Sequence, residues 1–266
     1  MDFAGKTVVV TGGSSGIGAA LVAAFHGAGS KVCVFDLARP EPVDDSIPFI
    51  SCDVADEMAL VKSIETAEAL LGPIDIFVSN AGIMGRQPSD VASCSNEDWQ
   101  RCWSVNVMAH VYAARALLPA MMARGSGYFV NVASAAGILN QIGDAAYSAT
   151  KHAAVSFAES LAISHAEDGI GVSLVCPQYV ATPLIGLGEA DAGCVPSLLT
   201  AADVAICILE AVKARRFFVL PHPDVARFAT ARAKDHDAWV LGMTRLRSKA
   251  IERFGDAQPE RFYRLV

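Results

Sequence analysis

Short runs rich in β-branched residues alternate along the chain with longer stretches of helical spacing, and this alternation restricts the fold most. Seven runs have the length and composition of buried strands: 7–10, 31–36, 47–52, 74–79, 127–134, 171–176 and 216–220. Helical spacing is found between them at 17–28, 56–71, 96–123, 145–167 and 201–213, with a bend expected before Pro119. Strands separated by helices predict an α/β fold: a single doubly wound domain with a seven-stranded parallel sheet and helices on both faces.

Composition and charge exclude several other classes of protein. The 266 residues are 53% hydrophobic and 18% charged, which is too apolar for a disordered chain. A net charge of −7 argues against a surface that binds nucleic acid. No run approaches the roughly 18 apolar residues of a membrane span, and the N-terminus has no secretory signal pattern. The seven cysteines and six histidines show no metal-ligand spacing. We therefore expect free thiols, no metal and a cytoplasmic location.

A glycine-rich turn, TGGSSGIG at residues 11–18, lies between the first strand and the first helix. Glycines let a backbone approach a phosphate closely, and a helix N-terminus offers free N–H groups and a positive dipole end to an anion. A tight turn without a ligand is the alternative. The strand–turn–helix context favours a dinucleotide site.

Asp36 ends the second strand, where a doubly wound sheet places the adenosine ribose. A carboxylate there accepts hydrogen bonds from both ribose hydroxyls and repels the 2′-phosphate of NADP. Neither the turn nor Leu37 supplies a basic residue, although Arg39 lies three residues further on. A helix cap or turn residue is the alternative reading of Asp36. The pattern favours NAD over NADP.

Tyr147 and Lys151 are four residues apart at the start of a long helix and therefore share one face. A free tyrosine has a pKa near ~10 and is a poor base at neutral pH. A nearby ammonium, together with the positive charge of an oxidised nicotinamide, favours the phenolate and is expected to lower that pKa. Such a pair is common on helix surfaces, but Ser134, at the end of the strand before, can direct its hydroxyl into the same cleft.

These landmarks together resemble the short-chain dehydrogenase/reductase family, in its classical group, over about residues 6–220. The matching segments, in chain order, are TGGSSGIG at 11–18, Asp53-Val54, Asn80-Ala81-Gly82, Asn106, Ser134, and Tyr147 with Lys151. The resemblance implies a Rossmann-fold catalytic and NAD-binding domain over residues 1–220. Two positions depart from the family pattern, because Ser79 replaces an asparagine and Gln178 replaces the glycine after Pro177.

The resemblance also implies roles for individual residues. Tyr147 would be the general acid/base, Lys151 would hold the nicotinamide ribose, Ser134 would bond the substrate oxygen, and Asn106 would fix a water of a proton relay. The residues implied in NAD binding are Gly12, Ser14, Ser15, Gly16, Ile17, Gly18, Asp36, Asp53, Val54, Asn80, Ala81, Gly82, Tyr147, Lys151, Pro177, Val180 and Thr182. The residues expected at the substrate are Ser134, Tyr147, Gln141, Gln178 and Leu184.

Small and apolar residues between Ser134 and Tyr147 indicate a hydrophobic pocket. The expected function is therefore hydride transfer between NAD and a secondary alcohol or ketone of a bulky aromatic, lipid or steroid-like substrate. A polyol or sugar dehydrogenase of the same fold is the alternative. A non-catalytic NAD-binding sensor or scaffold is a third reading, which the complete set of catalytic residues disfavours.

Residues 221–266 form an expected C-terminal helical extension, with helices at 224–240 and 243–254. Its apolar stripe needs a partner, either the glycine-rich segment 181–200 or a neighbouring subunit. We expect the extension to help close the substrate cleft. A homodimer or homotetramer is also expected, through helix faces that carry Tyr112, Ala113, Ala116, Leu117, Ala153, Phe157 and Leu161.

Overall fold

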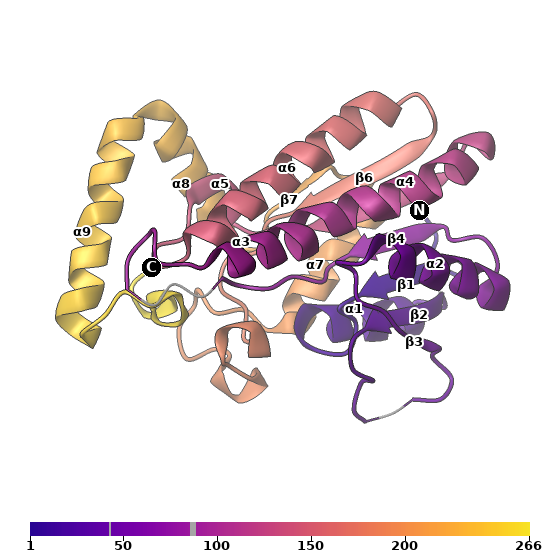
Figure 1. Cartoon of the computed structure of the whole chain (residues 1–266), viewed down its shortest axis with the longest axis horizontal. Coiled ribbons are helices and arrows are strands. Elements are labelled where there is room, and N and C mark those ends of the chain that lie inside the picture. Colours follow the sequence, from indigo (N-terminus) through magenta and orange to yellow (C-terminus); the bar gives the residue numbers. More distant parts are fainter. Residues whose placement is uncertain (43, 86–88) are drawn as a thin grey trace.

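The computed structural model describes residues 1–42, 44–85 and 89–266. Seven strands form one sheet in the order β3-β2-β1-β4-β5-β6-β7, and every neighbouring pair is parallel (Figure 1). The strands are β1 (Thr7–Thr11), β2 (Lys31–Asp36), β3 (Phe49–Ser51), β4 (Ile76–Ser79), β5 (Gly127–Val132), β6 (Ile170–Val175) and β7 (Phe218–Val219). The predicted doubly wound α/β fold is confirmed, and the strand order reverses direction at β1.

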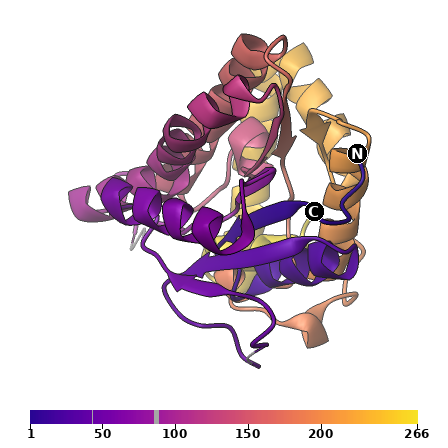
Figure 2. The same cartoon turned by 90° about the vertical axis from the view of Figure 1, so that its right-hand side faces the viewer.

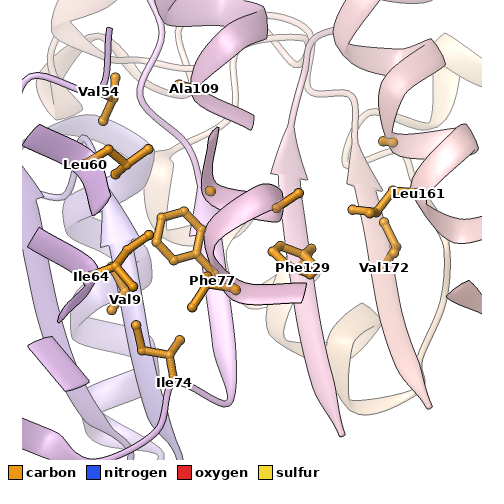
Figure 3. Close-up of a cluster of buried hydrophobic side chains, with 14 of the residues drawn as sticks. Val9, Val54, Leu60, Ile64, Ile74, Phe77, Ala109, Phe129, Leu161 and Val172 are labelled. Atoms are coloured by element: carbon orange, nitrogen blue, oxygen red, sulfur yellow. The ribbon is translucent and has the colours of Figure 1, made fainter. Parts of the chain in front are cut away.

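Helices cover both faces of this sheet (Figures 1 and 2). The helices between strands are α1 (Gly16–Gly27), α2 (Glu57–Leu71), α3 (Asn96–Trp103), α4 (Ala109–Ala123), α5 (Ala136–Leu139), α6 (Ala145–His165) and α7 (Ala201–Lys213). On one face, α2, α4 and α6 pack over the cluster in Figure 3, and on the other α1 and α7 pack side by side. Within β1, Val9 belongs to the first cluster while Val8 and Val10 belong to the second, because successive strand side chains point to opposite faces.

The region predicted as one helix over 96–123 is divided. A π-helical turn, η1 (Ser104–Met108), separates α3 from α4, and Pro119 lies inside α4. The departure from α-helical geometry therefore lies at Ser104–Met108. The bend was expected directly before Pro119, but α4 continues through that proline. This turn contains Asn106, and such π-turns are frequent at functional sites.

The C-terminal extension contains α8 (Pro223–Lys234), α9 (His236–Phe254) and a 3₁₀ segment, η4 (Pro259–Arg264). The break between the helices lies at Asp235, whose carboxylate accepts the N–H of Ala238 and caps α9, and not at 241–242 as expected. In Figure 1 α8 and α9 stand at one end of the molecule, beyond α5 and the start of α6.

Segment 181–200 is a short-helix insert with two 3₁₀ turns, η2 (Pro183–Ile185) and η3 (Glu189–Asp191). It packs against the extension in a separate cluster, in which Tyr179 and Leu198 meet Ala250, Phe262 and Tyr263. Of the two partners considered for the extension, segment 181–200 is the one that the extension contacts within this chain. Across the described parts of the chain, no helix is both long enough and apolar enough to span a bilayer.

Candidate active site

One pocket opens at the carboxyl ends of the strands, beside the point where the strand order reverses. Most of the predicted site residues line it. These are Gly12, Ser15, Gly16, Ile17, Asp36, Asp53, Val54, Asn80, Ala81, Gly82, Ser134, Gln141, Tyr147, Lys151, Pro177, Gln178, Val180, Thr182 and Leu184. Three predicted residues, Ser14, Gly18 and Asn106, are not among the residues that line this pocket.

The glycine-rich turn is shaped for close backbone approach. Gly12 has φ +62°, and a Cβ there would lie 2.9 Å from the Cα of Ala81. A Cβ on Gly18 would lie 1.9 Å from the carbonyl oxygen of Gly12, so this glycine packs α1 against the turn. Asn80 supports the same turn, since its amide donates to the carbonyl oxygens of Thr11 (3.0 Å) and Gly12 (3.1 Å).

The N-terminus of α1 faces this pocket without a side-chain cap. Ser15 is the N-cap residue, makes no capping hydrogen bond, and is followed by a first turn without acidic residues. The first N–H groups of a helix have no intrahelical partner and carry the positive end of the helix dipole. The turn and this helix end therefore fit the pyrophosphate of a dinucleotide.

The Asp36 carboxylate lies at the same pocket and is fixed by the backbone. It accepts the N–H of Ser14 at 3.0 Å and that of Leu37 at 2.7 Å. The hydroxyl of Ser14 donates to the carbonyl oxygen of Ala38 at 2.6 Å, so Ser14 braces the end of β2. Arg39 is paired with Asp45 at 2.9 Å on the surface.

Tyr147 is positioned by Asp144, a residue that the sequence analysis did not single out. Asp144 is the N-cap of α6 and accepts the N–H of Tyr147 at 2.9 Å and the N–H of Gly85 at 2.8 Å. Burial raises the pKa of Asp144, and these hydrogen bonds oppose that rise. An aspartate before the helical run Ala-Ala-Tyr was a visible N-cap signal.

Lys151 and Tyr147 are both buried, and their charges follow from that burial. The Nζ of Lys151 lies 5.6 Å from the centre of the Tyr147 ring and donates to the carbonyl oxygen of Val132 at 3.1 Å. Burial raises the pKa of Tyr147 to about 12, outweighing a hydrogen bond with Ser134 that lowers it. Burial also lowers the pKa of Lys151 to about 8. In the protein alone, desolvation disfavours both charges and outweighs the effect expected of Lys151 on the phenol.

Ser134 and Asn106 occupy different surroundings. Ser134 is at the end of β5, accepts the N–H of Ala136 at 3.1 Å, and reaches Tyr147 through the hydrogen bond above. Asn106 is fully buried in η1, where its amide exchanges two 2.9 Å hydrogen bonds with the backbone of Ile83 and donates to Thr150 at 3.0 Å. Asn106 therefore holds the segment after β4 against α6.

Two substrate-side predictions meet at Tyr179. Gln141 donates to the Tyr179 hydroxyl at 3.2 Å, and Gln178 precedes Tyr179 in the chain. The segment is supported by His222, one of the six histidines whose spacing predicts no metal site. Its Nδ1 accepts the N–H of Gln178 at 3.1 Å, and its Nε2 lies 2.9 Å from the carbonyl oxygen of Tyr179. Nothing in the local sequence marks this histidine, because its partners lie 43 and 44 positions away.

The described residues contain no candidate metal site. Within residues 1–42, 44–85 and 89–266, no group of three or more His, Cys, Asp or Glu side chains is arranged to hold an ion. Burial raises the pKa of the Cys176 thiol, next to Pro177 of the pocket, to about 12.

Comparisons with known proteins agree with this arrangement. The family model described as short chain dehydrogenase matches residues 6–191. The 1-deoxy-11-beta-hydroxypentalenate dehydrogenase of Streptomyces exfoliatus is 32% identical over 247 residues, 88% of each chain. A (21S)-21-acetoxyl-apo-melianone synthase SDR of Melia azedarach is 30% identical over 90% of this chain and 86% of its own.

A solved structure of a short-chain dehydrogenase/reductase from Burkholderia phymatum, in complex with NAD, superposes with a TM-score of 0.73 at 27% identity. The match covers 95% of this chain and 96% of that one. These relatives and this solved structure match 88–95% of the chain, and the family model matches residues 6–191. The chain belongs to the classical short-chain dehydrogenase/reductase family of oxidoreductases.

Proposed function

We propose that this protein is an NAD-dependent oxidoreductase that transfers a hydride between the nicotinamide and a secondary alcohol or ketone of a hydrophobic substrate. One observation carries the proposal. Ser134, Tyr147 and Lys151 line the same pocket as the glycine-rich turn and Asp36, so proton transfer and dinucleotide binding share one cleft.

The residues that would hold NAD follow from the pocket and from the family resemblance. The glycine-rich turn and the N-terminus of α1 suit the pyrophosphate, and Asp36 suits the adenosine ribose. Asp53 and Val54 would contact the adenine, segment 80–82 the adenosine ribose, and Pro177, Val180 and Thr182 the carboxamide. When bound, NAD supplies the hydride acceptor of the oxidation.

The chain's own groups would handle the proton and the geometry. Tyr147 would take the hydroxyl proton in oxidation and return it in reduction, while Ser134 would hold the substrate oxygen by a hydrogen bond. Lys151 would bind the nicotinamide ribose and Asn106 would position the water of a proton relay. In the structure of the protein alone, Asn106 contributes by fixing Ile83 and Thr150.

The preference for NAD over NADP rests on charge. A fixed carboxylate at Asp36 would repel a 2′-phosphate, whereas Arg39, three residues further along the chain, is engaged with Asp45 on the surface. A hydrophobic substrate is supported by the apolar side chains of the pocket that also contains Tyr147, among them Leu184 and Ile185.

Two alternatives lead to different observations. A polyol or sugar dehydrogenase of the same fold would oxidise sorbitol or glucose faster than apolar alcohols. A non-catalytic NAD-binding sensor would bind NAD and turn nothing over. In addition to the small-molecule substrate, a second copy of the chain is the partner that we propose.

The deciding experiment mixes purified protein, NAD and a panel of lipid, steroid, aromatic and sugar alcohols, and follows NADH by its absorbance. We expect NADH to appear with apolar secondary alcohols. Tyr147→Phe is the matched control, since it keeps the ring and removes the hydroxyl. Fastest turnover with sugars would favour the polyol alternative, and NAD binding without any turnover would favour the sensor.

A further inference from the structure

A second cavity, of about 370 Å³, lies directly beside the catalytic pocket. One wall comes from residues 135–142 and Tyr179. The opposite wall comes from the C-terminal extension, through α8, α9 and the last turn of the chain. The apolar side chains that this extension contributes are Phe228, Ala231, Ala238, Trp239, Met243, Leu246, Phe262 and Val266.

The extension is anchored on both sides of this cavity. Val225 of α8 is fully buried with Leu139 of α5, and Arg232 donates to the carbonyl oxygen of Ile138 at 2.8 Å. At the other side Gly143 has φ +86°, and a Cβ there would lie 2.4 Å from the carbonyl oxygen of Ala257. These contacts hold the extension against the rest of the chain on both sides of the cavity, so the wall that it forms is fixed in place.

The two cavities are adjacent, since Gln141, Gln178 and Tyr179 line both of them. The Gln141 amide and the Tyr179 hydroxyl are hydrogen-bonded to each other at 3.2 and 3.3 Å. This neutral pair is the boundary between the polar reacting end and the apolar space beyond it. Asp235 also lines the second cavity, but its carboxylate is engaged as the cap of α9.

We propose that this second cavity receives the apolar body of the substrate while its secondary alcohol or ketone carbon lies at Ser134 and Tyr147. The proposal rests on the proposed function and extends it. It assigns the substrate class as secondary alcohols with a long alkyl or fused-ring body on one side of the carbinol carbon. Gln141 and Tyr179 are then specificity-determining residues, because the substrate must pass between the two cavities beside them.

Gly242 offers a test that leaves the catalytic residues untouched. It lies on α9 one turn from Ala238 and one turn from Leu246, and all three line the cavity. A Cβ at Gly242 would meet no atom within 4 Å. An alanine there also raises helix propensity, since glycine in a helix interior is less favourable than alanine by about 1 kcal/mol. Gly242→Phe adds a large apolar side chain at this wall of the cavity, and Gly242→Ala is the control that adds only a methyl group.

Two measurements are made on the full chain. The first is kcat/KM with NAD for 2-alkanols from 2-butanol to 2-decanol. We expect the wild type and Gly242→Ala to gain with chain length, and Gly242→Phe to lose at least tenfold on 2-decanol while staying within twofold on 2-butanol. The second is binding of the neutral fluorophore N-phenyl-1-naphthylamine, which we expect Gly242→Phe to weaken at least tenfold.

Other results would contradict either this proposal or the proposed function. Equal losses on short and long alcohols, or unchanged fluorophore binding in Gly242→Phe, would overturn the proposal. An oligomer that dissociates in Gly242→Phe with an unchanged alcohol series would mean that a second copy of the chain occupies the cavity, and the proposal would be wrong. If the wild type oxidises no alcohol, the proposed function fails, and the fluorophore alone decides whether the cavity binds an apolar ligand.

Discussion

Lys151 points its ammonium at the carbonyl oxygen of Val132, 3.1 Å away, and lies 5.6 Å from the centre of the Tyr147 ring. Burial raises the pKa of Tyr147 to about 12 and lowers that of Lys151 to about 8. In the protein alone, Tyr147 is therefore a protonated phenol at neutral pH. That is the form required of an acid in carbonyl reduction, and oxidation requires the phenol to lose its proton.

This protonation state predicts how the two directions of the reaction depend on pH. Below the pKa of Tyr147, the phenolate fraction rises as pH rises. We therefore expect kcat/KM for oxidation of a secondary alcohol to increase between pH 6 and 7.5, below the pKa of Lys151, while carbonyl reduction does not increase over the same range. Initial rates followed by NADH absorbance in both directions test this. An oxidation rate that is constant from pH 6 to 7.5 would contradict it.

Removing the phenol hydroxyl tests its role directly. Tyr147→Phe should lower turnover by ~10²–10⁴-fold, the usual contribution of a general acid/base. NAD should still bind, because the turn at 11–18 and Asp36 are unchanged. Turnover is read from NADH absorbance and binding from calorimetry. Activity within tenfold of the wild type would show that Tyr147 is not the acid/base.

The coenzyme preference depends on one carboxylate. We expect the wild type to favour NAD over NADP in kcat/KM, and Asp36→Ala to narrow the ratio by losing ribose hydrogen bonds and relieving repulsion of the 2′-phosphate. Asp36→Asn is the matched control, since it keeps an acceptor for the N–H of Ser14 and removes only the charge. A wild type that favours NADP would mean that Arg39 leaves Asp45 to reach the phosphate, and Arg39→Ala would then lower that activity.

Assembly is predicted from helix faces that the fold leaves uncovered. Of the seven residues named for a subunit contact, Ala113, Leu117 and Leu161 are buried in the core of this chain, which leaves other residues of these helices for such a contact. On the same helices Ile163 is 80% exposed and Met122 is 40% exposed. We expect a homodimer or homotetramer through α4 and α6, with Ile163→Glu weakening it. Light scattering at micromolar concentration tests this, and a wild-type mass near 27.9 kDa would contradict it.

The sequence predicted those features that depend on short stretches of chain. The seven strands follow from β-branched runs, and the dinucleotide turn follows from glycines whose positions allow close approach. The division of 96–123 was missed, because the π-turn at Ser104–Met108 interrupts no hydrophobic pattern and is stabilised by contacts of Asn106 with Ile83 and Thr150. The raised pKa of Tyr147 was missed for a similar reason, since burial depends on segments that are distant in sequence.

The boundary between α8 and α9 shows the same limit within the extension. Apolar spacing continues through Asp235, so periodicity placed the break later in the chain. The structure has the break where the Asp235 carboxylate caps α9. The role of His222 could not be predicted from the sequence, because its two partners, the backbone groups of Gln178 and Tyr179, come near it only once β6 and β7 are paired.

His110 of α4 predicts how stability changes with pH. It is 3% exposed, and neither ring nitrogen has a hydrogen-bond partner among the described residues. Burial lowers its pKa from 6.5 to about 3, with a smaller effect from Lys151. The folded-state pKa is depressed, so the neutral ring's contribution is present above pH 6.5 and is lost as pH falls toward 3.

The pKa of His110 is 6.5 in the unfolded chain and about 3 in the folded chain. From this difference we expect His110 to lower the free energy of unfolding by about 2 kcal/mol between pH 7 and pH 5. His110→Leu replaces an unpaired buried ring with an apolar side chain and should lose less stability over this range than the wild type does. Urea unfolding of both proteins at pH 7 and pH 5 gives the difference. His222, whose pKa is also lowered by burial, is present in both proteins and cancels from that comparison. An equal loss of stability in wild type and His110→Leu would mean that His110 stays neutral in the unfolded chain or finds a proton partner in the folded one.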